Sequence, residues 1–79
     1  MHAAKIESSA RLQRVLRVLS DGAWHTTRDL VYRAEVCAVN SCIAELRVAG
    51  ASITCRREKI GDSLHFCYRM NSAPAGWAA

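Results

Sequence analysis

Thr26–Gly50, TTRDLVYRAEVCAVNSCIAELRVAG, is the stretch that decides the fold of this chain. It contains two short segments whose apolar residues recur at helical spacing, with a tight turn between them and Gly50 as the stop signal. We therefore expect two consecutive short helices. The residues before this stretch predict one supporting helix, and the residues after it predict a β-hairpin. The predicted order of elements is helix, helix, helix, hairpin.

The second helix is predicted to begin at Thr26, which is a good N-cap. Asp29 stands three residues on, as in a capping box with Asp in place of the usual Glu. The buried side of this helix is expected to consist of Leu30, Val31 and Ala34. The free N–H groups in the first turn of a helix suit a phosphate. Candidate phosphate contacts are therefore Thr26, Thr27 and Arg28, although simple capping explains the threonines equally well.

The third helix is predicted from about Ala38 to Val48, after a turn at residues 35–37. Its inward positions recur at i, i+4 and i+7 and are Val39, Ile43 and Leu46. The opposite face carries short side chains, so it could lie close to a nucleic-acid groove. The residues that could contact bases or phosphates from this face are Asn40, Ser41 and Arg47. Glu45 is expected on the same face, where it would repel phosphate.

The supporting helix is predicted to follow Ser8 or Ser9 as its cap. Its apolar face consists of Leu12, Val15, Leu16 and Leu19. Three arginines fall outside this face and are expected to be solvated. They are Arg11, Arg14 and Arg17. Residues 23–25 indicate a short extended segment that could add a third strand to the hairpin. Trp24 is expected to face the core, and His25 to have a structural role.

A β-hairpin is predicted from residue 52 onward. Residues 52–56 alternate and are rich in β-branched side chains, 57–63 are polar with Gly-Asp as a turn signal, and 64–70 form the return strand. One face of the return strand is expected to carry Leu64, Phe66, Tyr68 and Met70. The densest basic cluster of the chain lies at the expected tip and consists of Arg56, Arg57 and Lys59. These side chains could contact phosphates or a minor groove, and a solvated tip is the other interpretation.

The composition fits one small domain. The chain has 79 residues, of which 51% are hydrophobic, enough to build a single core. Its formal net charge is +4, and nine of its 11 basic residues are arginine, a mild excess that favours nucleic acid or another acidic partner. We expect a flexible lead at 1–8, the domain at 9–70 and a flexible tail at 71–79. Trp77 could fold back onto the core, dock a partner or remain free in that tail.

Several classes of protein are not indicated. No window is long and apolar enough to span a membrane, and the N-terminus shows no signal-peptide pattern, so we expect a cytoplasmic protein with free thiols. The cysteines, which we interpret as small buried hydrophobic residues, are Cys37, Cys42, Cys55 and Cys67. Paired carboxylates and a Gly-rich phosphate loop do not occur, so we expect no enzyme and no cofactor.

Two other interpretations involve cysteine. A zinc site would use Cys37 and Cys42, whose four-residue separation is wide for a zinc knuckle, with His65 and Cys67 on one strand face as further ligands. A dyad of Cys67 with His25 would be a nucleophile–base pair, but a chain of this length offers little room for a substrate cleft. We therefore expect neither a metal site nor catalysis.

The segment from about Ala10 to Met70 resembles the small prophage-type winged helix-turn-helix domains of bacteria. The similarity rests on the leucine-rich run of the first helix, on Thr-Thr-Arg-Asp-Leu at 26–30 and above all on the pattern I-x-E-L-R-x-x-G at 43–50. It implies an α+β fold with three helices followed by a two-stranded wing. Cys37 and Ala38 depart from the family, whose members often carry Thr or Ser and then Arg at these positions.

The resemblance also implies DNA binding in a phage or prophage regulatory setting, within the cytoplasm of a bacterial host cell. The third helix would enter the major groove, while the wing and the start of the second helix contact phosphates. The expected partner is double-stranded DNA, and a homodimer would add specificity by reading two half-sites. The alternative is a phage-encoded protein-interaction module on the same fold, acting as an adaptor or inhibitor of a host protein.

Overall fold

The computed structural model describes residues 9–77, so the expected lead at 1–8 and the end of the tail at 78–79 lie outside the described residues. Within this range the chain forms three helices and a three-stranded antiparallel sheet. The elements are α1 (Ala10–Leu19), β1 (His25–Thr26), α2 (Thr27–Ala34), α3 (Val39–Val48), β2 (Ser52–Ile60) and β3 (Ser63–Ser72). The α+β class is confirmed. The third strand that the sequence left open is present as β1, so the sheet has three strands rather than two.

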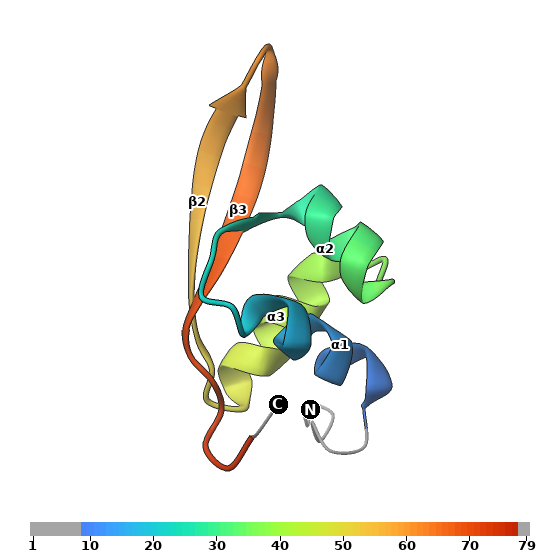
Figure 1. Cartoon of the computed structure of the whole chain (residues 1–79), viewed down its shortest axis with the longest axis vertical. Helices are drawn as coiled ribbons and strands as arrows, with labels where there is room; N and C mark the ends of the chain where they lie inside the picture. Colours follow the sequence, from blue (N-terminus) through green and yellow to red (C-terminus); the bar gives the residue numbers. More distant parts are fainter. Residues whose placement is uncertain (1–8, 78–79) are drawn as a thin grey trace.

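The helices gather at one end of the molecule, and the β2–β3 hairpin extends well beyond them (Figure 1). The shape is accordingly elongated, with extents of 39 × 22 × 22 Å. The largest fully buried side chains are Leu12, Leu16, Leu19, Leu30, Ile43, Leu46, Val15 and Cys42. The predicted apolar faces of α1 and α3 are thereby confirmed. Val31 was expected to be buried and is 40% exposed, because α2 turns only Leu30 and Ala34 inward.

The helix starts and stops follow local hydrogen bonding. Ser9 caps α1 by accepting from the Leu12 N–H, and Thr26 caps α2 by accepting from the Asp29 N–H at 3.0 Å. The α3 helix begins without a side-chain cap, because Ala38 stands at its N-cap position. Glu35 ends α2 in the left-handed region with φ 53°, a conformation that a non-glycine residue adopts only at some cost.

Strand β2 is longer than predicted. Residues 57–60, expected in a polar loop, continue the strand to Ile60, and only Gly61 and Asp62 separate it from β3. Gly61 has φ 61°, which glycine adopts without strain. The sequence misled here because charged residues are depleted in strands, whereas this part of the hairpin is exposed on both faces and needs no apolar alternation.

In the segment before α2, the residue that faces the core is His25 and not Trp24 as expected. Strand β1 pairs with β3 so that His25 lies opposite Tyr68, and this places His25 on the core side, 6% exposed. Trp24, expected to face the core, lies half-buried on the other side of the sheet, where Arg56 stacks on its ring at 4.1 Å from the centroid. Successive strand residues point to opposite faces, so only one of the two neighbours could face inward.

The described part of the tail packs on the domain. Strand β3 runs to Ser72, two residues past the expected boundary, and Pro74 is buried. Trp77 packs against the core, and its Nε1–H donates to Gln13 Oε1 of α1 at 2.9 Å. Of the three positions that the sequence left open for Trp77, the structure shows the one folded back onto the core.

Candidate nucleic-acid interface

The two strands of the hairpin present one face to the helices, here called the inner face. The register pairs its residues as Ile53 with Met70, Cys55 with Tyr68, Arg57 with Phe66, and Lys59 with Leu64. Ile53, Met70 and Tyr68 are buried in the core, whereas Cys55 and the two upper pairs are exposed. These eight residues include no Asp or Glu. The inner face is therefore apolar at its base and carries cations in the exposed part of the hairpin, residues 57–66, which is here called the arm.

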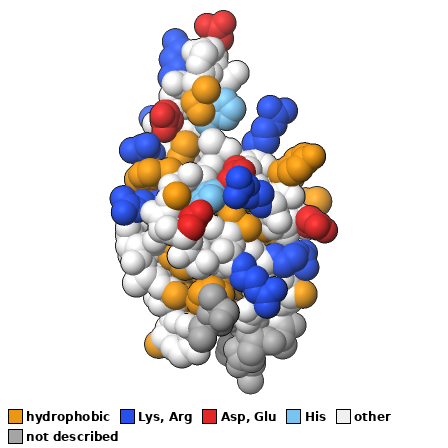
Figure 2. Space-filling view, viewed as in Figure 1, with side chains coloured by type: hydrophobic (Ala, Val, Ile, Leu, Met, Phe, Trp, Pro, Cys, Tyr) orange, Lys and Arg blue, Asp and Glu red, His pale blue; other side chains and the backbone are white. Residues whose placement is uncertain are grey.

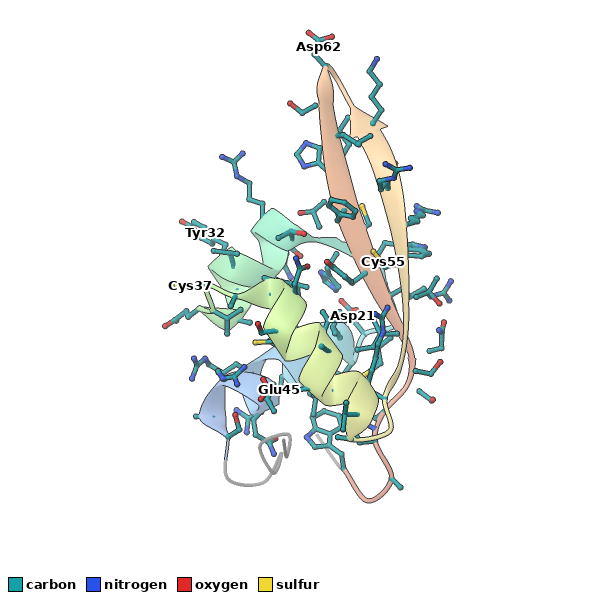
Figure 3. The ribbon with its side chains drawn as sticks, turned by 180° about the vertical axis from the view of Figure 1, so that it is seen from behind. Asp21, Tyr32, Cys37, Glu45, Cys55 and Asp62 are labelled. Atoms are coloured by element: carbon teal, nitrogen blue, oxygen red, sulfur yellow. The ribbon has the colours of Figure 1, made fainter. Side chains whose placement is uncertain are left out.

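A groove of about 310 Å³ lies between α3 and this inner face. Its lining consists of Asn40, Ile43, Ala44, Arg47, Cys55, Phe66 and Tyr68. The labelled Cys55 lies on the hairpin beside α3, and Asp62 marks the distant tip (Figure 3). The groove joins the exposed face of α3 to the arm, because Phe66 belongs to the groove lining and lies opposite Arg57.

Two of the predicted base-reading residues are held in this groove by the sheet. The Tyr68 hydroxyl donates to Asn40 Oδ1 at 2.8 Å, and Arg47 Nη2 donates to the Ile53 carbonyl at 2.8 Å. Asn40 keeps its amide N–H donors and a second lone pair on Oδ1, and Arg47 keeps most of its five donors. Both side chains are thus held in place and still have hydrogen-bonding groups available for a ligand. Tyr68 is a member of the site that the sequence placed only on a strand face, because its hydroxyl contact spans 28 residues.

Glu45 of α3 and Glu58 of β2 do not line the groove, although other residues of both elements do. Glu45, expected to repel phosphate, is half-buried and accepts from Arg11 Nη2 at 2.5 Å on the α1 side of α3. Glu58 lies on the outer face of β2, where Arg56 pairs with it at 3.2 Å. In the space-filling view the arm projects from the body and carries Lys and Arg side chains beside hydrophobic ones, with an acidic side chain at its tip (Figure 2). Glu45 therefore lies outside the groove, and the repulsion of phosphate that the sequence led us to expect does not apply to this surface.

The predicted basic cluster of the hairpin is divided by strand alternation. Arg57 and Lys59 are on the inner face, whereas Arg56 is on the outer face, where it contacts Trp24 and Glu58. The sequence treated the three as one group because it placed them together near the tip of the hairpin, with Arg57 and Lys59 in the turn. Only two of them share a surface with the α3 groove.

The predicted contacts at the start of α2 lie beside the arm. The Thr26 hydroxyl is occupied as the cap, and the Thr27 hydroxyl donates to the Phe66 carbonyl at 3.4 Å. Arg28 is exposed. Ser41, the remaining predicted contact, lines a different cavity, of about 480 Å³, between α1 and the α2–α3 turn. The groove thus brings together Asn40, Arg47 and the arm, but not Ser41.

A buried histidine supports the start of α2. His25 Nε2 lies 2.9 Å from Asp21 Oδ1, and His25 Nδ1 contacts Asp29 Oδ2, so each ring nitrogen faces a carboxylate. Such a ring is best satisfied as an imidazolium, because both nitrogens then donate. Burial opposes the charge, but the hydrogen bonds that His25 donates to Asp21 and Asp29 outweigh it and raise the pKa of His25. The structural role expected for His25 thus includes a charge network, which Arg33 extends by its 2.9 Å contact with Asp29.

The cysteines are all free within residues 9–77, but only two of them are buried. Cys37 and Cys55, expected inside the domain, are exposed, because the turn before α3 and the upper part of β2 lie outside the core. Over the same residues, no group of three or more His, Cys, Asp or Glu side chains is arranged to hold a metal ion. Nor is any helix in the described part of the chain long and apolar enough to cross a membrane.

Comparison of the chain with protein-family models, with curated proteins and with solved structures gives no significant match. The geometry of the groove and the arm is therefore the basis for a functional proposal.

Proposed function

We propose that this chain is a winged helix-turn-helix module that binds duplex DNA. In this proposal α2, the turn and α3 form the helix-turn-helix, and the β2–β3 hairpin is the wing. The observation that carries it is the acid-free surface formed by the α3 groove and the inner face, with Glu45 and Glu58 paired elsewhere. A concave surface with cations and neutral hydrogen-bonding groups is complementary to the phosphates and base edges of DNA.

Each part of the surface has a distinct task in the proposed complex. The α3 helix approaches the major groove, where Asn40 and Arg47 offer hydrogen bonds to base edges. Arg57 and Lys59 neutralise phosphates from the arm, and Arg28 does so from the start of α2. Because the sheet holds Asn40 and Arg47 before binding, less side-chain entropy is lost when the complex forms.

A role in phage or prophage transcription is part of the proposal and rests on the sequence resemblance. The alternative, a protein-interaction module on the same fold, is supported by Tyr32 of α2, which is 85% exposed next to the partly exposed Val31. Trp77, the other candidate for a protein contact, is engaged with α1 of its own chain. Trp77 therefore does not favour a protein partner, and the support for this alternative comes from Tyr32 and Val31.

The test is fluorescence anisotropy with mixed-sequence duplex DNA over a salt series. Each neutralised phosphate contributes about −0.9 to the slope of log K against log salt. The double variant Arg57→Ala/Lys59→Ala removes two such contacts, so the slope is expected to become shallower by roughly 1.8. Affinity at low salt should fall with it.

The matched control is Arg17→Ala/Arg69→Ala, which removes the same charge from exposed positions on α1 and on the outer face of β3. This variant should keep the parental slope to within one contact. Equal losses in the two double variants would mean that net charge, not this surface, drives binding. Absence of binding by the parental chain at low salt would refute the DNA function and direct attention to protein partners at Tyr32.

A further inference from the structure

The exposed arm carries two large apolar side chains that the fold does not bury. Leu64 is 60% exposed and Phe66 is 49% exposed, and both lie on the inner face of β3. The sequence pattern groups them with Tyr68 and Met70, which are buried. The arm extends beyond the helices, so the inner face of β3 is buried at its base and exposed further along. The two side chains form a small apolar patch on one face, which a ligand of matching chemistry could cover.

The neighbours of these two side chains define the chemistry of the ligand. Arg57 lies directly opposite Phe66, and Lys59 lies directly opposite Leu64, so cations and apolar groups alternate across the two strands. A ligand that fits must present negative charge and apolar surface within a few ångströms of each other. Nucleic acid does so, because its phosphates flank the faces of its bases.

The shape of the surface distinguishes DNA from a flat anionic membrane. Phe66 is also part of the groove beside α3, so the apolar side chains lie in the angle between the helix and the arm. A rod-shaped duplex can occupy such an angle, whereas a planar lipid surface would reach the tip of the arm and leave the groove empty.

We infer that Leu64 and Phe66 press against base pairs from the minor-groove side and partly unstack them, so that the protein selects deformable DNA; this rests on the function proposed above. A B-form minor groove is about 6 Å wide, and two strands spaced about 4.8 Å apart with their side chains need more room. The groove must therefore open when the arm enters it. Apolar side chains that insert at base steps open and kink a duplex in this way. Pyrimidine–purine steps deform most easily, and A-tracts resist.

The experiment compares two duplexes of equal length and charge, one with central TA steps and one with a central A-tract. Each carries 2-aminopurine at the centre, whose fluorescence rises when the base is unstacked. The parental chain is expected to bind the TA duplex on the order of ten-fold more tightly, since each base contact of this kind contributes measurably to affinity. Fluorescence should rise on binding to the TA duplex.

The variant Leu64→Ala/Phe66→Ala is expected to lose the preference and the fluorescence rise while retaining affinity for the A-tract duplex. The matched control is Ile60→Ala, because Ile60 is 48% exposed but on the outer face, opposite Ser63. It should behave as the parental chain. Circular dichroism checks folding, and the single variant Leu64→Ala serves as a milder second test.

The outcomes separate the inference from the function on which it rests. Equal affinity of the parental chain for the two duplexes, without a fluorescence rise, overturns the inference and leaves DNA binding standing. Failure to bind either duplex at low salt overturns both. If the chain instead binds anionic phosphatidylglycerol vesicles, and the double variant abolishes only that, the arm is a lipid-binding surface and the inference is wrong.

Discussion

His25 shows how one residue can link two segments through charge. Its ring joins Asp21, which follows α1, to Asp29 in the first turn of α2. The pKa of Asp21 is lowered chiefly by the hydrogen bond from the Ala23 N–H and then by His25. The charged forms of His25 and Asp21 therefore favour the folded state, and the stability of the domain depends on pH through this contact.

The raised pKa of His25 and the lowered pKa of Asp21 determine how the stability of the domain changes with pH. The raised pKa of His25 gives stability that is complete below its ordinary value of 6.5 and is lost as the pH rises through the folded-state value. The lowered pKa of Asp21 gives stability that is present above its ordinary value of 3.8 and is lost at more acidic pH. The contact contributes fully between these limits.

Replacing His25 by Gln should therefore destabilise the domain in a pH-dependent manner. At pH 6 the free energy of unfolding is expected to fall by about 1–3 kcal/mol, since charged hydrogen bonds to a buried ring are lost. At pH 9 the difference from the parental chain should be clearly smaller. Urea unfolding at the two pH values measures both differences. His65→Gln on the hairpin is the control, and an equal cost of His25→Gln at both pH values would contradict the charged network.

At the scale of elements, the two helices of the central stretch differ in how they begin. Thr26 caps α2 with its hydroxyl, whereas Ala38 offers α3 no side-chain acceptor. The first N–H groups of α3 are therefore without a side-chain partner of the usual kind. The N-cap position of α3 thus falls at Ala38, one residue after Cys37, where the domains that the sequence resembles often carry the capping Thr or Ser.

A serine at position 38 should supply the absent cap. Ala38→Ser is expected to raise the free energy of unfolding by about 1 kcal/mol, and Thr26→Ala to lower it by a similar amount. Thermal or urea unfolding of the two variants beside the parental chain provides the comparison. If Ala38→Ser leaves stability unchanged while Thr26→Ala lowers it, the start of α3 is already satisfied by another group.

At the scale of the whole molecule, the C-terminal segment closes the helical end of the domain. It follows β3 past the helices and lies at the end opposite the hairpin turn (Figure 1). Trp77 packs against the core there and donates a hydrogen bond to Gln13. The Trp77 contact and the exposed end of the hairpin therefore lie at opposite ends of the molecule.

This separation predicts that Trp77→Ala weakens the fold without weakening DNA binding. The free energy of unfolding should fall by about 1–3 kcal/mol, less than for a fully buried tryptophan because the ring is half-buried. Affinity for duplex DNA, measured at a temperature where the variant is folded, should match that of the parental chain. Trp77→Phe keeps most of the packing and should cost about 1 kcal/mol. A selective loss of DNA affinity in Trp77→Ala would place the tail in the interface.

The sequence by itself determined the order of the elements, the cap at Thr26, a cap for α1 at Ser8 or Ser9, and the apolar faces of α1 and α3. These features depend on residues within one or two helical turns, so local spacing and hydrogen bonding are enough to specify them. The inner face of the return strand was also predictable, because alternation along a strand is local.

Only the tertiary structure decided which of those faces meet and where each strand leaves the core. It divided Arg56 from Arg57 and Lys59, paired Glu45 with Arg11, and left Leu64 and Phe66 exposed on a face that is buried lower down. Tyr68 and Asn40 are likewise joined only by folding. These contacts depend on how far the hairpin extends past the helices, a length that no local pattern encodes because both faces of the arm are free of the core.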